Sequence, residues 1–366
     1  MRSYVFPGDI DPAIMEIGAR PFLYMRTDAF SQINKESEQI LLDLIHSTDG
    51  RTIIYTGSGT GAMSAVVENY VTTKQKAIVI DGGSFGHRWF QLCEYYGVPV
   101  IDYTVGFAKD IDYEDIKKTI AAEHPDVFLC QHHETSTGQL FNLEKIGALC
   151  RKYGVSLVVD VISSFLAEPL SMDEYGIDIA ITSTQKGLNI PPGLSVLFFS
   201  KHLDGYAWNH KGYYWDFDDN FANLRRGQTP FSPATILYLQ LNARLRQLRA
   251  EGGESCNIKA VRHRALKFRE CCRKYGWKIP AEVPSFAITG FQPADTADRK
   301  IFKGLMEKYD TYIMPGGKPG FYRVSHLGLQ TDRELEELAD RIHEFEPRKK
   351  SLPTELSTCC TRAIST

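Results

Sequence analysis

Two stretches of the chain decide its fold: Val158-Val159-Asp160 and Ser183-Thr184-Gln185-Lys186-Gly187. An acid ends one apolar strand, and a lysine follows a second apolar strand predicted over residues 177–182. Pyridoxal 5′-phosphate chemistry needs such a pair, because its aldehyde forms a Schiff base with a lysine and its pyridine nitrogen is kept protonated by a buried carboxylate. Taken alone, each residue is explained more simply as a strand-end acid or a surface lysine. The surrounding sequence therefore decides whether the two residues form a cofactor-binding pair.

Strands and helices alternate on both sides of this pair. The apolar pattern predicts strands over 52–55, 77–80, 98–105, 126–131, 155–160, 177–182 and 195–199, and helices over 31–47, 61–71, 87–96, 113–123 and 143–153. The alternation predicts an α/β fold with a mostly parallel, seven-stranded-type sheet covered on both faces. Ligands of such sheets bind at the carboxyl ends of the strands.

The rest of the chain predicts a smaller domain. A helix over 233–250 is followed by Glu251-Gly252-Gly253, and further helices are expected over 258–275, 297–309 and 332–346, with strands over 285–291 and 320–324. We therefore expect an irregular N-terminal arm over 1–20, a large cofactor-binding domain over 21–255, a small C-terminal α+β domain over 256–350 and a tail over 351–366.

The composition narrows the classes of protein. The 366 residues are 43% hydrophobic and 24% charged, with a formal net charge of −3, so no basic field favours nucleic acid or an anionic membrane. No apolar run approaches the ~20 residues of a membrane span, and residues 1–7 lack a signal-peptide core. The eight cysteines show neither CxxC nor zinc spacing. We expect a cytoplasmic protein with reduced thiols and no metal.

A glycine loop, Thr56-Gly57-Ser58-Gly59-Thr60-Gly61-Ala62, joins a strand to a helix. Its amides and the helix N-terminus suit a phosphate. The loop also satisfies the dinucleotide pattern G-x-G-x-x-A, with Asp81 at the end of the next strand where a ribose-binding acid would sit. A dinucleotide-binding oxidoreductase is therefore a real alternative, although it gives Asp160 and Lys186 no role.

Two further motifs end strands. In Gly82-Gly83-Ser84-Phe85-Gly86-His87-Arg88, the phenyl ring of Phe85 can stack on a flat heteroaromatic ring. The run His132-His133-Glu134-Thr135-Ser136-Thr137-Gly138 offers hydroxyl groups to a polar ligand. Its adjacent histidines are a poor zinc pair, because neighbours on a strand face opposite sides.

In combination, these motifs resemble the class V aminotransferases of fold type I. The pattern is most similar to the alanine/serine–glyoxylate and 2-aminoethylphosphonate–pyruvate group. The matching segments are 57–59, 83–88, 133–138, 159–160, 176–178, 183–186, 190–193, 213–216, 229–230 and 322–324.

The resemblance implies a role for each matching residue. Lys186 corresponds to the Schiff-base lysine and Asp160 to the partner of the pyridinium nitrogen. The other implied cofactor contacts are Phe85 and Ile162 on the two ring faces, Thr135 on the phenolic side, and Ser58, Gly59, Thr60 and Gln185 at the phosphate. Thr229 corresponds to a phosphate contact from the neighbouring subunit, which implies a homodimer with shared sites. Arg323 corresponds to the arginine that grips the substrate carboxylate through a planar fork.

The sequence departs from the family at Thr60, at Arg226 and in the segment 21–27, which contains Arg26. We expect an aminotransferase that moves an amino group from a small donor such as alanine or serine to pyruvate or glyoxylate. Within the family, the alternative is a phosphonate donor with Arg26 or Arg226 as anion contact. Outside this activity, the alternatives are the dinucleotide-binding oxidoreductase and a catalytically silent regulator; a cysteine desulfurase is disfavoured because residues 310–325 hold no cysteine.

Overall fold

A computed structural model of the chain describes residues 1–21, 23–209, 212–293 and 300–346. The predicted tail over 351–366 lies outside the described residues. None of the helices in the described ranges is both long and apolar enough to cross a bilayer.

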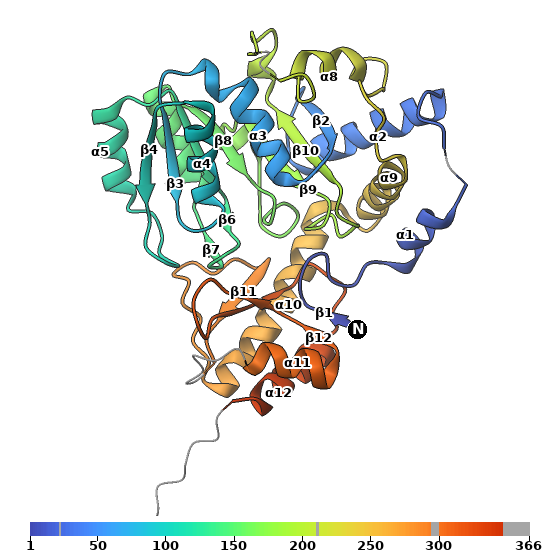
Figure 1. The fold of residues 1–366 in the computed structure, drawn as a ribbon, viewed down its shortest axis with the longest axis vertical. Coiled ribbons are helices and arrows are strands. Elements are labelled where there is room, and N and C mark those ends of the chain that lie inside the picture. Colours follow the sequence, from blue (N-terminus) through green and yellow to red (C-terminus); the bar gives the residue numbers. More distant parts are fainter. Residues whose placement is uncertain (22, 210–211, 294–299, 347–366) are drawn as a thin grey trace, which may run out of the picture.

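A seven-stranded sheet forms the centre of the large upper part of the molecule (Figure 1). Its order is β2 (Arg51–Thr56), β10 (Leu194–Phe199), β9 (Ile179–Ser183), β8 (Ser156–Asp160), β5 (Val127–Gln131), β3 (Ala77–Asp81) and β4 (Val100–Thr104). β10 runs antiparallel to both neighbours, and the pairs from β9 to β4 are all parallel. The prediction of a mostly parallel sheet is confirmed.

Apolar side chains project from both faces of the sheet, and this explains why helices cover both faces. Along β8, Leu157 and Val159 belong to one hydrophobic cluster and Val158 to the other, as the two-residue period of a strand requires. The helices of this part are α2 (Asp28–Leu44), α3 (Gly59–Asn69), α4 (Gly86–Tyr96), α5 (Tyr113–Glu123), α6 (Leu143–Tyr153), α7 (Met172–Tyr175), α8 (Phe217–Leu224) and α9 (Thr235–Ala250). Because hydrophobic clusters fill both faces of the sheet, a ligand is expected at the carboxyl ends of the strands.

The small lower part of the molecule is α+β (Figure 1). It contains α10 (Gly253–Tyr275), α11 (Lys300–Tyr309), α12 (Asp332–Glu344) and an antiparallel sheet in the order β11 (Ile288–Phe291), β14 (Tyr322–Ser325), β13 (Met314–Pro315). A short hairpin of β6 (His133–Glu134) and β7 (Gln139–Leu140) follows β5. The exact domain boundaries stay a prediction.

The first 20 residues are not wholly irregular. β1 (Arg2–Ser3) pairs in parallel with β12 (Thr311–Tyr312) in the small part. α1 (Pro12–Glu16) is capped by the Asp11 side chain and begins with a proline, and a 3-10 turn (Ile17–Ala19) follows. The strand was missed because its partner lies some 300 residues away in sequence, where no local pattern can indicate it.

Candidate active site

The carboxyl ends of β8 and β9 bring the two residues of the opening motif together. Asp160 ends β8 and pairs with Ile181 of β9, and Lys186 follows β9 by three residues. Both side chains are buried. One Asp160 carboxylate oxygen (Oδ1) accepts a 2.7 Å hydrogen bond from the amide N–H of Ile162. The sequence prediction that these groups share a site is consistent with this placement.

Burial sets the charge state of both groups. It lowers the pKa of Lys186 to about 7, with Asp160 opposing the shift and Arg323 adding to it. Burial also raises the pKa of Asp160 to about 7, and the hydrogen bond from Ile162 opposes that shift. The charged forms of Lys186 and Asp160 lose hydration on burial, and their contacts with neighbouring groups replace it only in part. An uncharged amine near neutral pH can bond to a carbonyl carbon and accept a proton.

The glycine loop opens α3 beside this pair. The Ser58 hydroxyl caps the helix by accepting from the amide of Gly61 at 3.3 Å. A Cβ added to Gly59 would lie 2.4 Å from the Cδ1 of Ile162, so only glycine allows this close approach. Thr60 accepts a 2.9 Å hydrogen bond from Arg88, which brings a positive charge to the same helix start. Amides, helix dipole and guanidinium together favour an anion.

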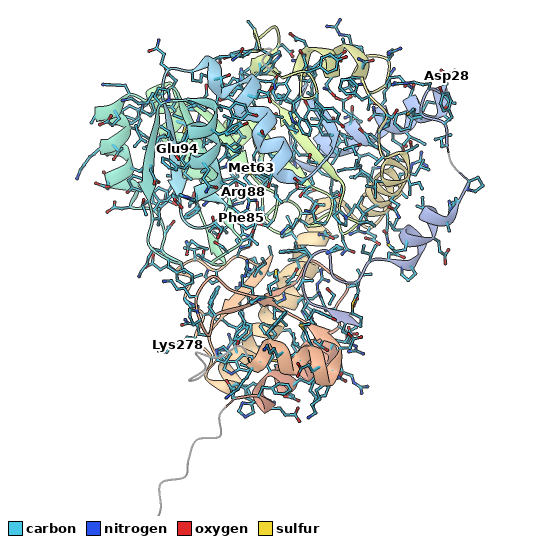
Figure 2. All side chains as sticks on the ribbon, in the orientation of Figure 1. Asp28, Met63, Phe85, Arg88, Glu94 and Lys278 are labelled. Atoms are coloured by element: carbon cyan, nitrogen blue, oxygen red, sulfur yellow. The ribbon has the colours of Figure 1, made fainter. Side chains whose placement is uncertain are left out.

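Phe85 stands at the start of α4 and is half-buried. The guanidinium carbon of Arg88 lies 5.0 Å from the centre of its ring, and the two residues are labelled together in Figure 2. The loop before α4 is held by Glu134, a buried carboxylate that accepts from the amide of Gly86 at 3.0 Å and from the side chain of Gln131 at 2.9 Å. Sequence reasoning gave Glu134 no role, because it lies between His133 and Thr135 in a run of polar residues, where one carboxylate does not stand out.

A second polar group lies after β5. Thr135 and the Ser163 hydroxyl are 2.7 Å apart, and His133 Nδ1 lies 2.8 Å from the same hydroxyl. Within the described residues, His133 Nε2 and the hydroxyl of Ser183 are buried without a hydrogen-bond partner. Burial holds the pKa of His133 well below its usual range, so the ring is neutral. Buried polar atoms without partners favour a ligand that satisfies them.

Arg323 reaches toward this group from β14 of the small part. Its Nη1 donates to the carbonyl of Thr135 and its Nη2 to the carbonyl of Pro315, each at 2.9 Å. Its Nε is buried and, among the described residues, has no partner. A guanidinium carries five N–H donors, so two carbonyls fix its position without exhausting it. The predicted carboxylate-binding residue is thus close enough to Lys186 to lower its pKa.

Arg26 and Thr229 lie apart from this cluster and contact each other. The Arg26 guanidinium donates to the carbonyl of Thr229 at 2.7 Å and to Gln228 at 3.1 Å. In the part of the chain that the structure describes, neither residue forms a hydrogen bond with Lys186 or Arg323. Gln185 is half-buried beside Lys186.

The arrangement does not suit the dinucleotide alternative. β2, which leads into the glycine loop, lies at an edge of the sheet, and its one neighbour in the described strand order, β10, is antiparallel. A dinucleotide-binding half instead places this loop after a parallel strand inside the sheet. Asp81, the expected ribose ligand, forms a 2.7 Å pair with His87.

A family model described as aminotransferase class-V matches residues 21–223. The chain belongs to the class V aminotransferase family. A soluble hydrogenase small subunit from Synechococcus is 28% identical over 339 residues, covering 89% of this chain and 87% of the relative. An L-aspartate–glyoxylate aminotransferase from Paracoccus denitrificans is 26% identical over 343 residues, covering 89% and 86%. The crystal structure of an alanine–glyoxylate aminotransferase from Nostoc has a TM-score of 0.86 at 21% identity, covering 93% of each chain, and so shares the fold.

The cofactor of this aminotransferase is pyridoxal phosphate, and its substrates are an amino acid and a 2-oxo acid. The residues present fit that group. They supply a buried amine, a buried acid that lacks a cationic hydrogen-bond partner in the described chain, and an anion-binding helix start at Gly59. The unpartnered Ser183 and His133 atoms lie among them. The oxidoreductase and silent-regulator alternatives are displaced by the family assignment.

Proposed function

We propose that this aminotransferase moves an amino group from a small donor, such as alanine or serine, to pyruvate or glyoxylate, with Lys186 as the covalent cofactor lysine. The observation that carries the proposal is the pair of buried residues Lys186 and Asp160 at the strand ends, with the half-buried Arg323 beside Lys186. It combines an amine that is uncharged near neutral pH, an acid and a guanidinium, which are the groups that transamination of an α-amino acid requires.

The cofactor contacts follow from the placement of the side chains. Ser58, Gly59, Thr60 and Gln185 would hold the phosphate. Phe85 and Ile162 would cover the two faces of the ring, Thr135 would lie at its phenolic side, and Asp160 would hold a proton on the ring nitrogen. Bound pyridoxal phosphate supplies an aldehyde carbon that bonds amines and a ring that withdraws electrons.

The chain's own groups would then orient the donor and move its proton. Arg323 holds the donor carboxylate, and Thr135 and Pro315 keep the guanidinium in place through their carbonyls. Once the donor amine has displaced it from the cofactor, the uncharged Lys186 amine would accept the proton from the donor Cα and later return it. Because the carboxylate is held at one point, the Cα–H bond keeps a fixed direction toward the amine.

A homodimer follows from the family resemblance and is supported by an aromatic surface. Tyr213 is 86% exposed and Tyr214 is 42% exposed. Tyr214 stacks on Phe231, with ring centres 5.1 Å apart, two residues beyond Thr229. Trp215 packs against the glycine loop, where a Cβ on Gly61 would lie 3.2 Å from its ring. We propose that a second subunit covers this surface and receives Thr229 at its phosphate.

The absence of a disulfide among the described cysteines is compatible with a cytoplasmic location. The six cysteines that the structure describes (93, 130, 150, 256, 271 and 272) are all free thiols. Disulfides are rare in the cytosol and common in oxidising compartments. A cytoplasmic location is therefore part of the proposal.

An acidic donor is the second candidate, because the Paracoccus relative is named for L-aspartate and the phosphonate enzymes were an alternative from sequence. An aspartate donor carries a second anionic group besides its α-carboxylate, so the site would need a second cationic side chain to bind it. Arg26 is engaged by Thr229 and Gln228, and Arg226 donates to Asn223 at 2.5 Å. In the described residues these contacts tie both guanidinium groups to residues 223–229 and not to Lys186 or Arg323, which favours the small donor.

The test is the visible spectrum of the purified protein loaded with pyridoxal phosphate. Alanine, serine, aspartate and 2-aminoethylphosphonate are added separately, and product oxo acids are measured with pyruvate or glyoxylate as acceptor. We expect alanine or serine to bleach the absorption of the lysine-bound cofactor and to support turnover, and Lys186→Ala to show neither. Bleaching by aspartate or the phosphonate alone would assign the acidic donor, and no response to any amine would refute the proposal.

A further inference from the structure

Phe6 lies over the Lys186 amine, and nothing in the sequence indicated it. The centre of the Phe6 ring is 3.1 Å from Nζ, and the side chain is half-buried. A phenyl face is an apolar cover for an uncharged amine and attracts it electrostatically when it is charged. The ring therefore occupies space beside the reacting nitrogen.

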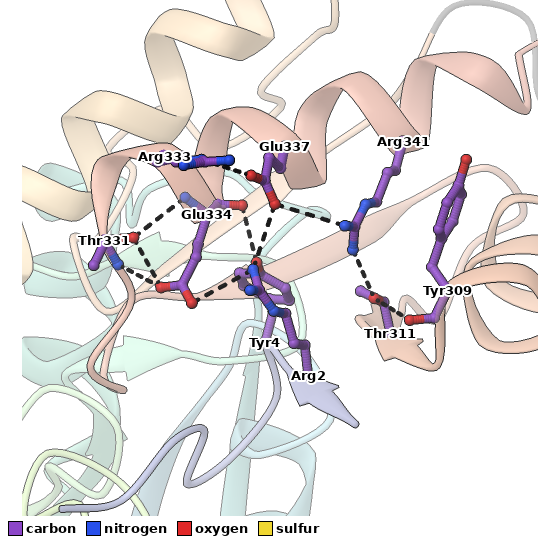
Figure 3. A network of polar contacts seen from close by, with 9 residues as sticks. All are labelled: Arg2, Tyr4, Tyr309, Thr311, Thr331, Arg333, Glu334, Glu337 and Arg341. Carbon is purple, nitrogen blue, oxygen red and sulfur yellow. Dashed lines mark hydrogen bonds and ion pairs between the residues drawn. The ribbon is translucent and has the colours of Figure 1, made fainter.

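The segment before Phe6 is anchored to the small part of the molecule. The amide of Tyr4 donates to the carbonyl of Tyr312, and the amide of Ser325 donates to the carbonyl of Tyr4, each at 2.9 Å. The Tyr4 hydroxyl donates to the backbone carbonyl of Glu334 at 2.9 Å, and Arg2 pairs with the Glu334 carboxylate at 3.4 Å, as Figure 3 shows. Residues 2–4 are thus fixed on three sides.

The segment after Phe6 is anchored to the loop that carries Lys186. The side-chain amide of Asn189 donates to the carbonyl of Pro7 at 2.8 Å, and the backbone amide of Asn189 donates to the carbonyl of Lys186 at 2.9 Å. Phe6 also packs on a small apolar cluster that includes Ile288 and Leu327. The position of the ring is therefore determined from both sides.

The same strand anchors Phe6 and carries Arg323. β14 holds Arg323 and, two residues later, Ser325, which binds the carbonyl of Tyr4. A donor held by its carboxylate at Arg323 and reacting at Lys186 would lie beside the Phe6 ring, which contacts Nζ. β14 therefore carries the residue that would hold the carboxylate and also anchors the segment before Phe6.

We propose that Phe6 is a specificity-determining residue that restricts the amino donor to a small side chain. The proposal rests on the transamination proposed above. In a closely packed site, one additional methylene changes discrimination by roughly 10- to 200-fold. The phenyl ring excludes longer aliphatic donors, and its removal admits them.

The experiment compares Phe6→Ala and Phe6→Leu with the unmodified enzyme. kcat/KM is measured for alanine, 2-aminobutyrate and norvaline with one acceptor. We expect Phe6→Ala to raise the ratio of norvaline to alanine by at least about tenfold, and Phe6→Leu to raise it less. Val5→Ala is the matched control, because it trims the neighbouring side chain of the same segment and should leave the ratio unchanged.

A second measurement needs no activity. In the cofactor-free protein at pH 9, the rate at which an acetylating reagent modifies Lys186 is followed by peptide mass spectrometry. Because the pKa of Lys186 is about 7, the amine is uncharged at this pH, and the rate reports access to it. We expect a several-fold faster modification in Phe6→Ala and no change in Val5→Ala.

The two measurements separate the possible failures. A wild-type protein without transamination refutes the proposed function, while the labelling rate still reports whether Phe6 covers Lys186. An unchanged donor ratio in an active enzyme, in both Phe6→Ala and Phe6→Leu, overturns the proposal whether or not labelling accelerates. Circular dichroism identifies a variant that has not folded, and the donor ratio of the other variant then decides.

Discussion

Replacing Arg323 by lysine tests the carboxylate-binding role, because it keeps the charge and removes the fork. In the structure, Arg323 uses one N–H for the carbonyl of Thr135 and another for that of Pro315, and it still has donors for a substrate. An ammonium group is a single point with three N–H bonds. It cannot reach two carbonyls on different elements and also present a parallel pair of donors to a carboxylate.

The size of the effect follows from the lost hydrogen bonds. A hydrogen bond to a charged partner contributes about 1.5–3 kcal/mol, and each ~1.4 kcal/mol changes an equilibrium tenfold. The loss of one of the paired bonds should therefore lower kcat/KM by roughly 10- to 100-fold. The effect should fall equally on amino acid and oxo acid, since both carry the carboxylate, and the cofactor absorption should not change.

Steady-state kinetics with donor and acceptor varied separately are the assay. Arg264→Lys is the matched control, because Arg264 is also half-buried in the small part and donates to a backbone carbonyl, that of His326, at 2.8 Å. We expect the control to keep both values of kcat/KM. If Arg323→Lys kept them as well, another residue would hold the carboxylate, and the reasoning would be wrong.

Three other changes test the rest of the site. Asp160→Asn should lower turnover by orders of magnitude with the fold intact, since the ring nitrogen loses its charged partner; near-normal kcat would contradict this role. Glu134→Gln should weaken cofactor binding, measured as the dissociation constant of pyridoxal phosphate, because the acceptor that holds the loop of Phe85 loses its charge; unaltered binding would exclude that function. The pKa of Lys186 is about 7 in the folded protein and about 10 in the unfolded chain. Between these pH values the folded protein binds fewer protons at Lys186 than the unfolded chain does, so the free energy of unfolding rises with pH. In urea unfolding of the cofactor-free protein, the stability advantage of Lys186→Met should therefore shrink from pH 7 to 10, and a constant difference would speak against a lowered pKa.

The local sequence correctly predicted the helices whose ends are marked by capping residues. The helices over 113–123 and 143–153 were predicted to the residue, because Asp112 and Asn142 cap their starts and the apolar positions follow the helical period. The helix predicted over 258–275 begins instead at Gly253. Only Glu251 and Gly252, the latter with φ of 103°, separate α9 from α10, so the next helix begins almost at once. A glycine pair marks a break but does not give its length.

The proximity of Asp160 and Lys186 was predictable, because one ends and the other follows neighbouring strands that a parallel sheet aligns at one edge. Contacts between distant segments were not. The bond between Arg323 and Thr135 joins residues 188 positions apart, and Phe6 reaches Lys186 across 180. The sequence around one residue of such a pair contains no information about the other residue, so these contacts are seen only in the folded structure.

The chemistry of the site explains why such distant contacts are needed. Lys186 and Asp160 are both removed from water, and their own contacts replace that hydration only in part. Burial keeps this amine uncharged near neutral pH, and a ring from outside the central sheet contributes to that burial. Arg323 and Phe6 come from the small part and the N-terminal segment, and β14 carries Arg323 and bonds to Tyr4, two residues before Phe6. The strand that would bind the substrate carboxylate thus also anchors the segment before Phe6, while Asn189 ties the segment after Phe6 to the loop of Lys186.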